Sequence, residues 1–318
     1  MTAVPTPAET LWSIALAGGR GTRLAEGRKR LERATHPHLP ASAWGTAGPK
    51  ALASMRAGPT GPVKPMIEWH LDVHAACRRI ERIILAAGTG GDLLQHHFQA
   101  AGGSYRGLPV ELLIEERPAG TIAPIVKLHA AGRLPERPVV YANADNLLDA
   151  DLYGCYRHGL ERAAACGIDP GECVIDVAAL VPWEESGDYG ALDLDESSGL
   201  VRGFREKAPK ERNPFLERAG RRWTPINSGF SIIPNPRRLF VRYLDEAIVR
   251  TSQALERGEL DYAAHEGAVK YESLYERVAA DGRMVAVLAE GYWTDLGTEQ
   301  KIRAAEARLP ALSFAQAS

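Results

Sequence analysis

The sequence predicts an α/β fold with a central, mostly parallel sheet flanked by helices, followed by a β-rich part. Two observations predict this class. Short apolar runs alternate with segments of helical period over residues 11–145, which is typical of a parallel sheet with helices on both faces. Beyond about residue 170, extended segments joined by turns replace that alternation.

The first half contains four expected strands and three expected helices. The strands are short runs rich in Val, Ile, Leu and Ala, at 11–18, 82–88, 110–116 and 138–145. The helices lie between them, at 66–79, 91–102 and 122–134. The first has apolar residues at helical spacing, and Asp92 opens the second.

The second half mixes extended segments with helices. Strands are expected within 173–181, 189–208, 223–234 and 283–297, with a turn at Ser197 to Gly199. Helices are expected at 236–255, 272–282 and 298–309, the last with Thr298 as its N-cap. Because no repeat or linker interrupts the chain, we expect a single domain over 1–318, with halves at about 11–150 and 151–310.

The composition excludes several classes of function. The 318 residues include 38 basic and 40 acidic side chains, so the chain has no overall positive charge that would indicate nucleic acid or an anionic membrane as a partner. No apolar run approaches the ~20 residues of a membrane span, and the first residues do not resemble a signal peptide. The four cysteines lack the spacing of a metal site or a disulfide framework. We therefore expect a cytoplasmic protein.

The glycine-rich segment LAGGRGTRL follows the first expected strand. A dinucleotide-binding loop needs a third glycine where Leu24 stands, and a P-loop needs a Lys-Ser or Lys-Thr that is missing. Two interpretations remain on the glycines alone. The segment is either an ordinary turn or a phosphate loop of another type, in which backbone N–H groups, Arg20 and Arg23 meet the anion.

Further motifs follow the glycine loop in a fixed order. They are GPKAL, VKPMIEWHL, EERPAGTIAP, VVYANADNLLDADL, YGALDLD, FREKA, INSGF and YWTDLGT. This series resembles the sugar-1-phosphate nucleotidyltransferases, also called nucleotide-sugar pyrophosphorylases, from Leu16 to about Glu306. The resemblance implies the Rossmann-like nucleotide-diphospho-sugar transferase fold, with a smaller β-rich part that binds the sugar.

The resemblance also implies the reaction. An oxygen of a sugar 1-phosphate attacks the α-phosphorus of a nucleoside triphosphate, pyrophosphate leaves, and a nucleotide sugar forms. Positioning and charge neutralisation carry such chemistry, and no covalent intermediate is needed. The residues implied to act in catalysis are Arg23, Lys50 and Asp145, and those implied to bind the nucleotide are Leu16, Gly18, Gly19, Gly21, Thr22 and Arg23.

Two aspartates match the family's magnesium ligands. Asp145 ends an expected strand and Asp295 lies in YWTDLGT. Hard carboxylates suit Mg²⁺, which keeps several waters and bridges to substrate phosphates. Without the flanking motifs, Asp145 would be interpreted as a turn residue, Asp295 as a loop cap and Lys50 as an exposed loop lysine.

The implied sugar-phosphate residues lie in the second half: Gly190, Glu206, Lys207 and Asn227. The resemblance assigns Gly190 to close approach of the sugar, Glu206 and Asn227 to its hydroxyls, and Lys207 to its phosphate. Glu206 and Lys207 could instead form an ordinary surface pair of little energetic value. The sequence does not distinguish mannose, glucose, heptose or a cyclitol phosphate.

The base is expected to be read by IEERPAGTIAP, through Glu115, Gly120 and Thr121. An ionised carboxylate only accepts hydrogen bonds, so Glu115 suits the two adjacent donors of guanine. The wording of this segment also resembles mannose- and heptose-1-phosphate guanylyltransferases. The alternative function is a thymidylyl- or uridylyltransferase that acts on glucose 1-phosphate. The alternative role for Glu115 is that it only ends a strand and contacts no base.

The chain departs from the family pattern in two places. Ala144 replaces the usual glycine before the metal aspartate, and the spacer 25–48 is longer than the family norm. We expect that spacer, with its two histidines, to be a lid or subunit contact rather than a metal site. No hexapeptide-repeat β-helix is expected, and a homo-oligomer is left open.

A rival of another class is a catalytically silent homologue that binds nucleotide sugars and regulates an active partner. That alternative predicts loss of Lys50, Asp145 or Asp295, and all three are present.

Overall fold

The computed structural model describes residues 8, 10–19, 23–24, 26–117 and 119–316. The chain divides into two compact units, each built from discontinuous segments. The glycine-loop unit comprises Trp12–Pro118, Ala142–Ala150 and Gly291–Ser318, and the β-rich unit comprises Met1–Leu11, Ala119–Tyr141 and Asp151–Glu290. The expectation of a single domain stays a prediction.

The glycine-loop unit contains neighbouring strands of an α/β sheet. These are β1 (Leu11–Leu16), β4 (Ile80–Ala87), β6 (Leu108–Ile114) and β5 (Ser104–Tyr105), adjacent in that order. Strands β4 and β6 are parallel, with Ile83 opposite Val110, and Ile83, Ile84 and Leu85 are fully buried. Such a continuous apolar run is typical of a strand covered on both faces.

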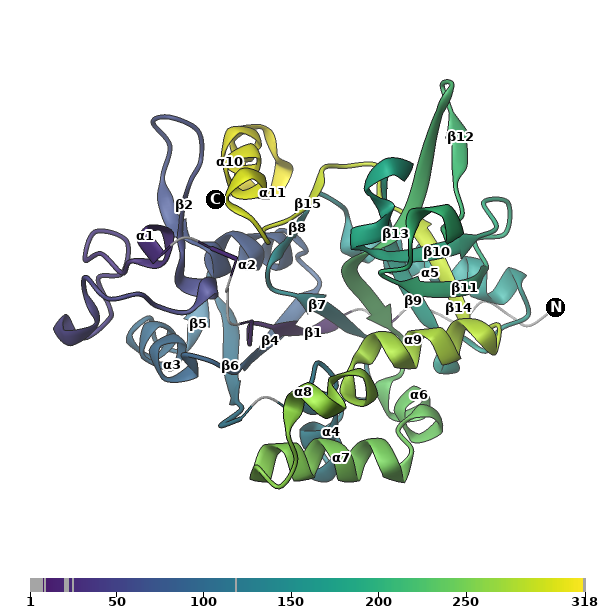
Figure 1. The fold of residues 1–318 in the computed structure, drawn as a ribbon, viewed down its shortest axis with the longest axis horizontal. Coiled ribbons are helices and arrows are strands. Elements are labelled where there is room, and N and C mark those ends of the chain that lie inside the picture. Colours follow the sequence, from purple (N-terminus) through teal and green to yellow (C-terminus); the bar gives the residue numbers. More distant parts are fainter. Residues whose placement is uncertain (1–7, 9, 20–22, 25, 118, 317–318) are drawn as a thin grey trace. The chain divides into compact units, whose positions relative to one another are not determined.

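The α-helices of this unit can be followed in Figure 1. They are α1 (Glu26–Lys29), α2 (Met66–Ala76), α3 (Gly91–Ala100), α10 (Glu299–Arg308) and α11 (Ser313–Gln316). Two antiparallel pairs complete it: β2 (Ser54–Arg56) with β3 (Val63–Pro65), and β8 (Asn146–Leu148) with β15 (Trp293–Asp295). Thr298 caps α10 by accepting a hydrogen bond from the Lys301 N–H, which confirms the expected N-cap.

The β-rich unit contains mostly antiparallel strands. They are β9 (Val174–Pro182), β10 (Gly190–Leu194), β11 (Val201–Glu206), β12 (Leu216–Arg218), β13 (Arg221–Ile233) and β14 (Met284–Leu288). Strand β13 pairs antiparallel with β9, β10 and β12, and β9 pairs parallel with β14. Strand β7 (Val139–Asn143) contributes residues to both units. The predicted class, an α/β fold with a large mixed sheet flanked by helices, is confirmed.

The helices of the β-rich unit are α4 (Ala123–Ala130), α5 (Leu152–Ala165), α6 (Pro236–Tyr243), α7 (Glu246–Arg257), α8 (Tyr262–His265) and α9 (Tyr271–Ala280). The expectation of one helix over 236–255 was wrong. The helix ends at Tyr243, and the Asp245 side chain accepts a hydrogen bond from the Ile248 N–H to cap a new helix. Helix α5 was missed because Gly154 and Gly159 lower its helical propensity. A side chain at Gly159 would collide with Ile175 of β9, so packing requires glycine there.

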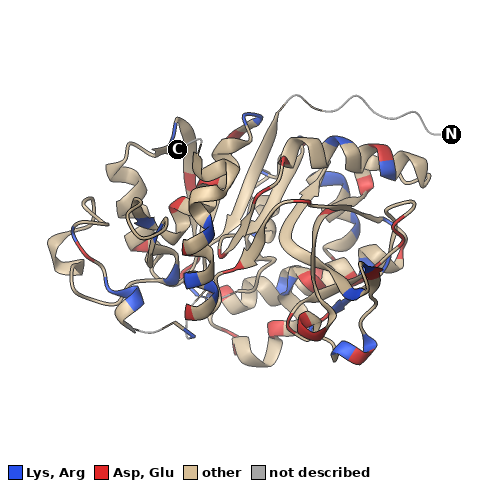
Figure 2. Cartoon of the chain, turned by 90° about the horizontal axis from the view of Figure 1, so that it is seen from above, with Lys and Arg blue, Asp and Glu red and all other residues tan. Residues whose placement is uncertain are grey.

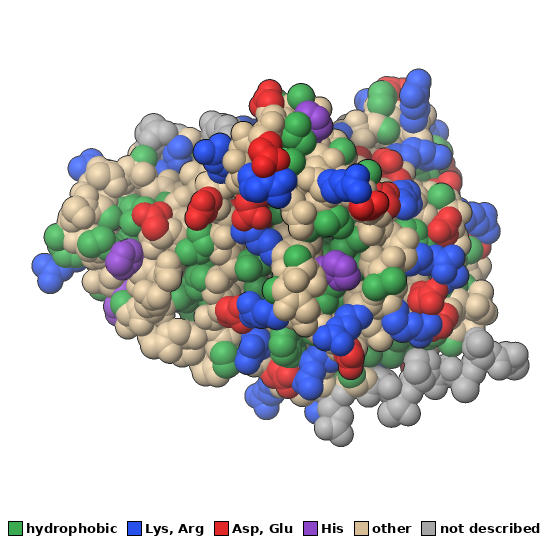
Figure 3. All heavy atoms as spheres, turned by 90° about the horizontal axis from the view of Figure 1, so that it is seen from below, with side chains coloured by type: hydrophobic (Ala, Val, Ile, Leu, Met, Phe, Trp, Pro, Cys, Tyr) green, Lys and Arg blue, Asp and Glu red, His purple; other side chains and the backbone are tan. Residues whose placement is uncertain are grey.

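Figure 2 shows that Lys, Arg, Asp and Glu residues lie chiefly on helices and loops. On the face shown in Figure 3, positive and negative side chains are interspersed rather than gathered by sign. Within the described residues, no helix combines the length and apolar character that crossing a membrane requires.

Candidate active site

The glycine loop begins where β1 approaches β4. The Ala17 N–H donates to the Ala86 carbonyl over 2.7 Å, and a Cβ at Gly18 would lie 3.3 Å from the backbone nitrogen of Gly88. Glycine at both positions therefore lets the two strand ends come close. A Cβ at Gly19 would meet nothing within 4 Å, so that backbone borders open space. The predicted contacts of Gly21 and Thr22, like Arg20, lie outside the described residues.

Glu115 lies beside this glycine pair. It follows β6, and its N–H donates to the Ala87 carbonyl over 2.8 Å. A Cβ at Gly88 would lie 3.8 Å from Glu115 Oε2. The structure therefore brings the predicted base-reading carboxylate and the predicted phosphate loop to the same end of the sheet.

Lys50 and Asp145 form a close ion pair. Lys50 opens a 3₁₀ turn after Pro49 and is only 7% exposed, and its Nζ lies 2.6 Å from Asp145 Oδ2. Asp145 follows β7, and its neighbour Ala144 donates its N–H to the Leu16 carbonyl over 3.0 Å. Burial opposes ionisation of Asp145, but the Lys50 ammonium outweighs it and holds the pKa of that carboxyl below its usual range.

Asp295 reaches the neighbourhood of Asp145 through the β8–β15 ladder. Asp295 pairs with Asn146 in that ladder, and the Leu296 N–H donates to the Asp145 carbonyl over 2.7 Å. The two predicted metal ligands, far apart in sequence, therefore occupy adjacent backbone positions. Asp295 Oδ1 accepts from the Gly297 N–H over 2.9 Å, and Oδ2 forms an ion pair with Lys301.

Arg23 borders the same group. A Cβ at Gly297 would lie 2.6 Å from Asp295 Oδ1 and 2.9 Å from Arg23 Nη2. Glycine at 297 thus leaves room for a guanidinium next to a carboxylate. Arg23, Lys50, Asp145 and Asp295 form one group of opposite charges at the end of β7.

The carboxylates of Asp145 and Asp295, which pair with Lys50 and Lys301, provide oxygen ligands of the kind that Mg²⁺ prefers. Within the described residues, no group of three or more His, Cys, Asp or Glu side chains could hold a metal ion. Mg²⁺ commonly uses only one or two protein carboxylates and takes its other ligands from water and phosphates. The Asp145 side chain is 42% exposed, which leaves it accessible to such a cation.

A buried histidine pair lies behind Asp145 and was missed at the sequence level. His70 Nδ1 lies 2.9 Å from the Asn146 carbonyl, and His74 Nε2 lies 2.9 Å from His70 Nε2. Burial lowers the pKa of His70 to about 4 and lowers that of His74 as well, so both rings are neutral at pH 7. His70 then donates to Asn146 and accepts from His74. Their i, i+4 spacing in the expected helix was the available signal.

Gly120 and Thr121 lie in the β-rich unit, against the start of α9. Gly120 has φ +93°, and a Cβ there would lie 2.3 Å from the Val269 carbonyl oxygen. The Thr121 hydroxyl accepts from the Tyr271 N–H over 2.9 Å and donates to Glu272 Oε2 over 3.2 Å. Local packing therefore accounts for both residue types, and their contact with a base stays a prediction.

The structure brings Gly190, Glu206 and Lys207 together. Gly190 pairs with Glu206 across β10 and β11, and a Cβ at Gly190 would lie 3.0 Å from Glu206 Oε2. Lys207 has φ +46°, and its Nζ lies 3.6 Å from Glu206 Oε1. The nearby Glu272 carboxyl, missed at the sequence level, has its pKa raised by burial and by the charge of Glu206.

Asn227 uses its amide inside the β-rich unit. Its Nδ2 donates to the buried Asp176, and its Oδ1 accepts from the Gly229 N–H over 2.8 Å. Burial raises the pKa of Asp176 to about 8, despite hydrogen bonds from Asn227 and Ser231 that oppose the rise. Asp176 is therefore mostly protonated at pH 7. The signal in the sequence was a single acidic residue, Asp176, within an otherwise apolar strand, which indicates a buried carboxyl group.

The fold has a solved counterpart. No protein-family model matches this sequence, and no curated protein matches it. Among the matching solved structures is HddC from Yersinia pseudotuberculosis, a crystal structure of a complex with GMP-PN. The match has a TM-score of 0.56 and 17% sequence identity, and covers 93% of this chain and 98% of HddC. This likeness shows that the two proteins share a fold over nearly their whole lengths.

Proposed function

We propose that the protein is a guanylyltransferase that forms a nucleotide sugar and pyrophosphate from GTP and a sugar 1-phosphate. The observation that carries this proposal is the Lys50–Asp145 ion pair beside Asp295 and Arg23, in the unit that holds the glycine loop. Two cations and two carboxylates at a strand end suit a reaction between anions. The sugar is a mannose, heptose or related sugar or cyclitol 1-phosphate.

In the proposed mechanism, Lys50 exchanges its carboxylate partner for the substrate phosphates. Backbone at Gly18 and Gly19 and the Arg23 guanidinium hold the triphosphate, and the sugar-phosphate oxygen attacks the α-phosphorus in line. A new P–O bond forms as the bond to the β-phosphate breaks, and Lys50 neutralises charge on the pyrophosphate that leaves. Mg²⁺, held by Asp145 and Asp295, supplies further charge neutralisation when bound.

Support for guanine comes from Glu115 and from HddC. Glu115 follows β6 near the glycine loop, where its carboxylate can accept from guanine N1–H and the N2 amino group. HddC shares the fold and was crystallised with GMP-PN, a guanine nucleotide. The β-rich unit is assigned the sugar 1-phosphate, through Gly190, Glu206, Lys207 and Asn227.

The test is a screen of pyrophosphate release with each of GTP, dTTP, UTP, ATP and CTP against a panel of sugar 1-phosphates, with Mg²⁺. We expect release with GTP and a mannose- or heptose-type phosphate. Preferred use of dTTP or UTP with glucose 1-phosphate would replace guanine by the alternative base. Folded protein that turns over no pair would favour the silent nucleotide-sugar-binding homologue.

A further inference from the structure

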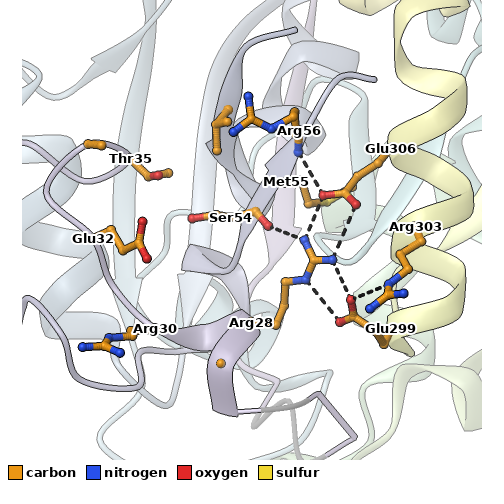
Figure 4. Close-up of a pocket in the computed structure, with 13 residues that line it drawn as sticks. Arg28, Arg30, Glu32, Thr35, Ser54, Met55, Arg56, Glu299, Arg303 and Glu306 are labelled. Carbon is orange, nitrogen blue, oxygen red and sulfur yellow. Dashed lines mark hydrogen bonds and ion pairs between the residues drawn. The ribbon is translucent and has the colours of Figure 1, made fainter. Parts of the chain in front are cut away.

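A cavity of about 790 Å³ lies in the glycine-loop unit. The spacer segment from Gly27 to Thr35 forms one wall, the β2–β3 hairpin forms another, and helix α10 forms the third (Figure 4). None of its lining residues belongs to the predicted nucleotide, metal or sugar site. The long spacer, which the nucleotidyltransferase motifs left unexplained, thus builds a hollow of its own.

Arg28 links the three walls of this cavity. Its guanidinium contacts Glu299 Oε1 over 2.6 Å and Glu306 Oε1 over 2.8 Å, and Nη1 donates to the Ser54 carbonyl over 3.0 Å. Figure 4 shows Arg28 between the hairpin and these two glutamates of α10. The hydrogen bond to Glu299 is the main cause that raises the pKa of Arg28. Two carboxylates therefore already balance this cation.

The remaining lining carries positive charge. Four arginines and three glutamates line the cavity, so its formal charge is +1. Glu299 and Glu306 balance Arg28 and Arg303, whose Nε lies 3.1 Å from Glu299 Oε1, so the excess positive charge lies with Arg30 and Arg56, against Glu32. Arg30 and Arg56 are exposed, and the polar residues Thr35 and Ser54 also line the cavity. This lining suits a small anionic ligand with polar groups rather than an apolar one.

Helix α10 connects the cavity to Asp295. The helix starts directly after Thr298, and its first turn carries both Glu299, which holds Arg28, and Lys301, which pairs with Asp295. A ligand that draws Arg28 or Arg303 away from Glu299 would alter that turn and thereby the partner of a predicted metal ligand. The first turn of α10 thus contributes one side chain to the cavity, Glu299, and another to the ion pair with Asp295, Lys301.

We propose that this cavity is a second ligand site, for a small metabolite bearing a phosphate or carboxylate group, and that its occupancy changes turnover through α10. The coupling to turnover rests on the proposed function, whereas binding in the cavity does not. The ligand is an anion that Arg30 and Arg56 bind, and the role of the spacer is to form one wall of the cavity.

Calorimetric titration tests the site, with inorganic phosphate and citrate as separate probes and no Mg²⁺. The full chain carrying Lys50→Gln is used, so that the nucleotide-phosphate site is weakened. We expect Arg30→Gln with Arg56→Gln to weaken binding of a probe at least tenfold. Arg33→Gln is the matched control, because Arg33 lies on the same spacer but stacks on Trp44, 5.2 Å from its ring centre, outside the cavity.

The two probes distinguish a phosphate site from a carboxylate site, and binding of either supports the proposal. Glu32→Gln removes a negative charge from the lining and should tighten binding, a result that misfolding cannot mimic. Binding of neither probe, or equal binding with and without Arg30 and Arg56, would overturn the site. Coupling is then measured in chains that keep Lys50, as a twofold or larger change in the rate of nucleotide-sugar formation on adding the probe that binds. This change should be lost in the chain that carries both Arg30→Gln and Arg56→Gln. A chain that binds the probe but turns over no substrate would contradict the proposed function and leave the site standing.

Discussion

Replacing Lys50 by glutamine separates its role in catalysis from its role in stability. The Lys50 side chain is 9% exposed and that of Asp145 is 42% exposed, so this ion pair is neither fully buried nor a surface pair. Surface pairs contribute about 0–1 kcal/mol, and breaking a buried pair costs about 3–5 kcal/mol. Since Asp145 keeps its access to water, we expect the free energy of unfolding to fall by about 1–3 kcal/mol.

The expected effect of Lys50→Gln on turnover is larger than its effect on stability. If the ammonium neutralises phosphate charge in the transition state, its loss should lower kcat by about 10²–10³-fold, as for removal of one preorganised donor. Initial rates of pyrophosphate release, with urea unfolding on the same preparation, measure both quantities. Lys127→Gln is the matched control, because Lys127 also forms a partly buried ion pair, with Glu256. A folded Lys50→Gln variant with kcat within threefold of the unmodified protein would refute the phosphate role.

Three further predictions concern other parts of the chain. The raised pKa of Asp176 means that the folded state binds more protons than the unfolded state between about pH 4 and 8. The free energy of unfolding should therefore fall with rising pH in this window by up to about 1.4 kcal/mol per pH unit. Urea unfolding at pH 5 and pH 8 measures this slope, and Asp176→Asn should make it smaller. An unchanged slope would contradict the raised pKa of Asp176. Arg28→Gln should lower the free energy of unfolding by about 1–2 kcal/mol, because Glu306 and Glu299 both lose their contact with Arg28 and only Glu299 keeps another cation, Arg303. Arg250→Gln, which breaks an exposed pair with Glu246, should lower it by at most about 0.5 kcal/mol; equal effects would show that the Arg28 contacts add nothing to stability. Gly297→Ala should lower kcat while Gly267→Ala does not, since only the first Cβ would meet charged atoms within 3 Å; equal rates would count against the Asp295 site.

The sequence predicts the longer elements of the glycine-loop unit, which have apolar runs or apolar residues at helical spacing: β1, β4, β6, α2, α3 and α10. It missed the short elements α1, α11, β2, β3, β5 and β8. Strand β4 contains the continuous apolar run 83–87, β1 and β6 are mostly apolar, and α10 carries a Thr298 cap that can be read locally. The break between α6 and α7 depends on one capping aspartate inside a pattern that otherwise continues as helix, so periodicity alone did not detect it.

The contacts between distant segments are what the sequence could not supply. Arg28 meets Glu299 and Glu306 more than 270 positions later, and no local pattern predicts such a pair. Asp145 and Asp295 could be predicted through motifs, but their adjacency depends on the β8–β15 register. Burial likewise decides the protonation of Asp176, which as a residue type would be expected to be ionised.

The proposed reaction transfers the guanylyl group of GTP, which includes the α-phosphate, to a sugar 1-phosphate. Parallel reactions with [α-³²P]GTP and [γ-³²P]GTP test it most directly, with Asp145→Asn as the inactive control. The α label should appear in a nucleotide sugar and the γ label in pyrophosphate, both only when sugar 1-phosphate is present. Release of the γ label as orthophosphate, or of the α label without a nucleotide sugar, would contradict the claim.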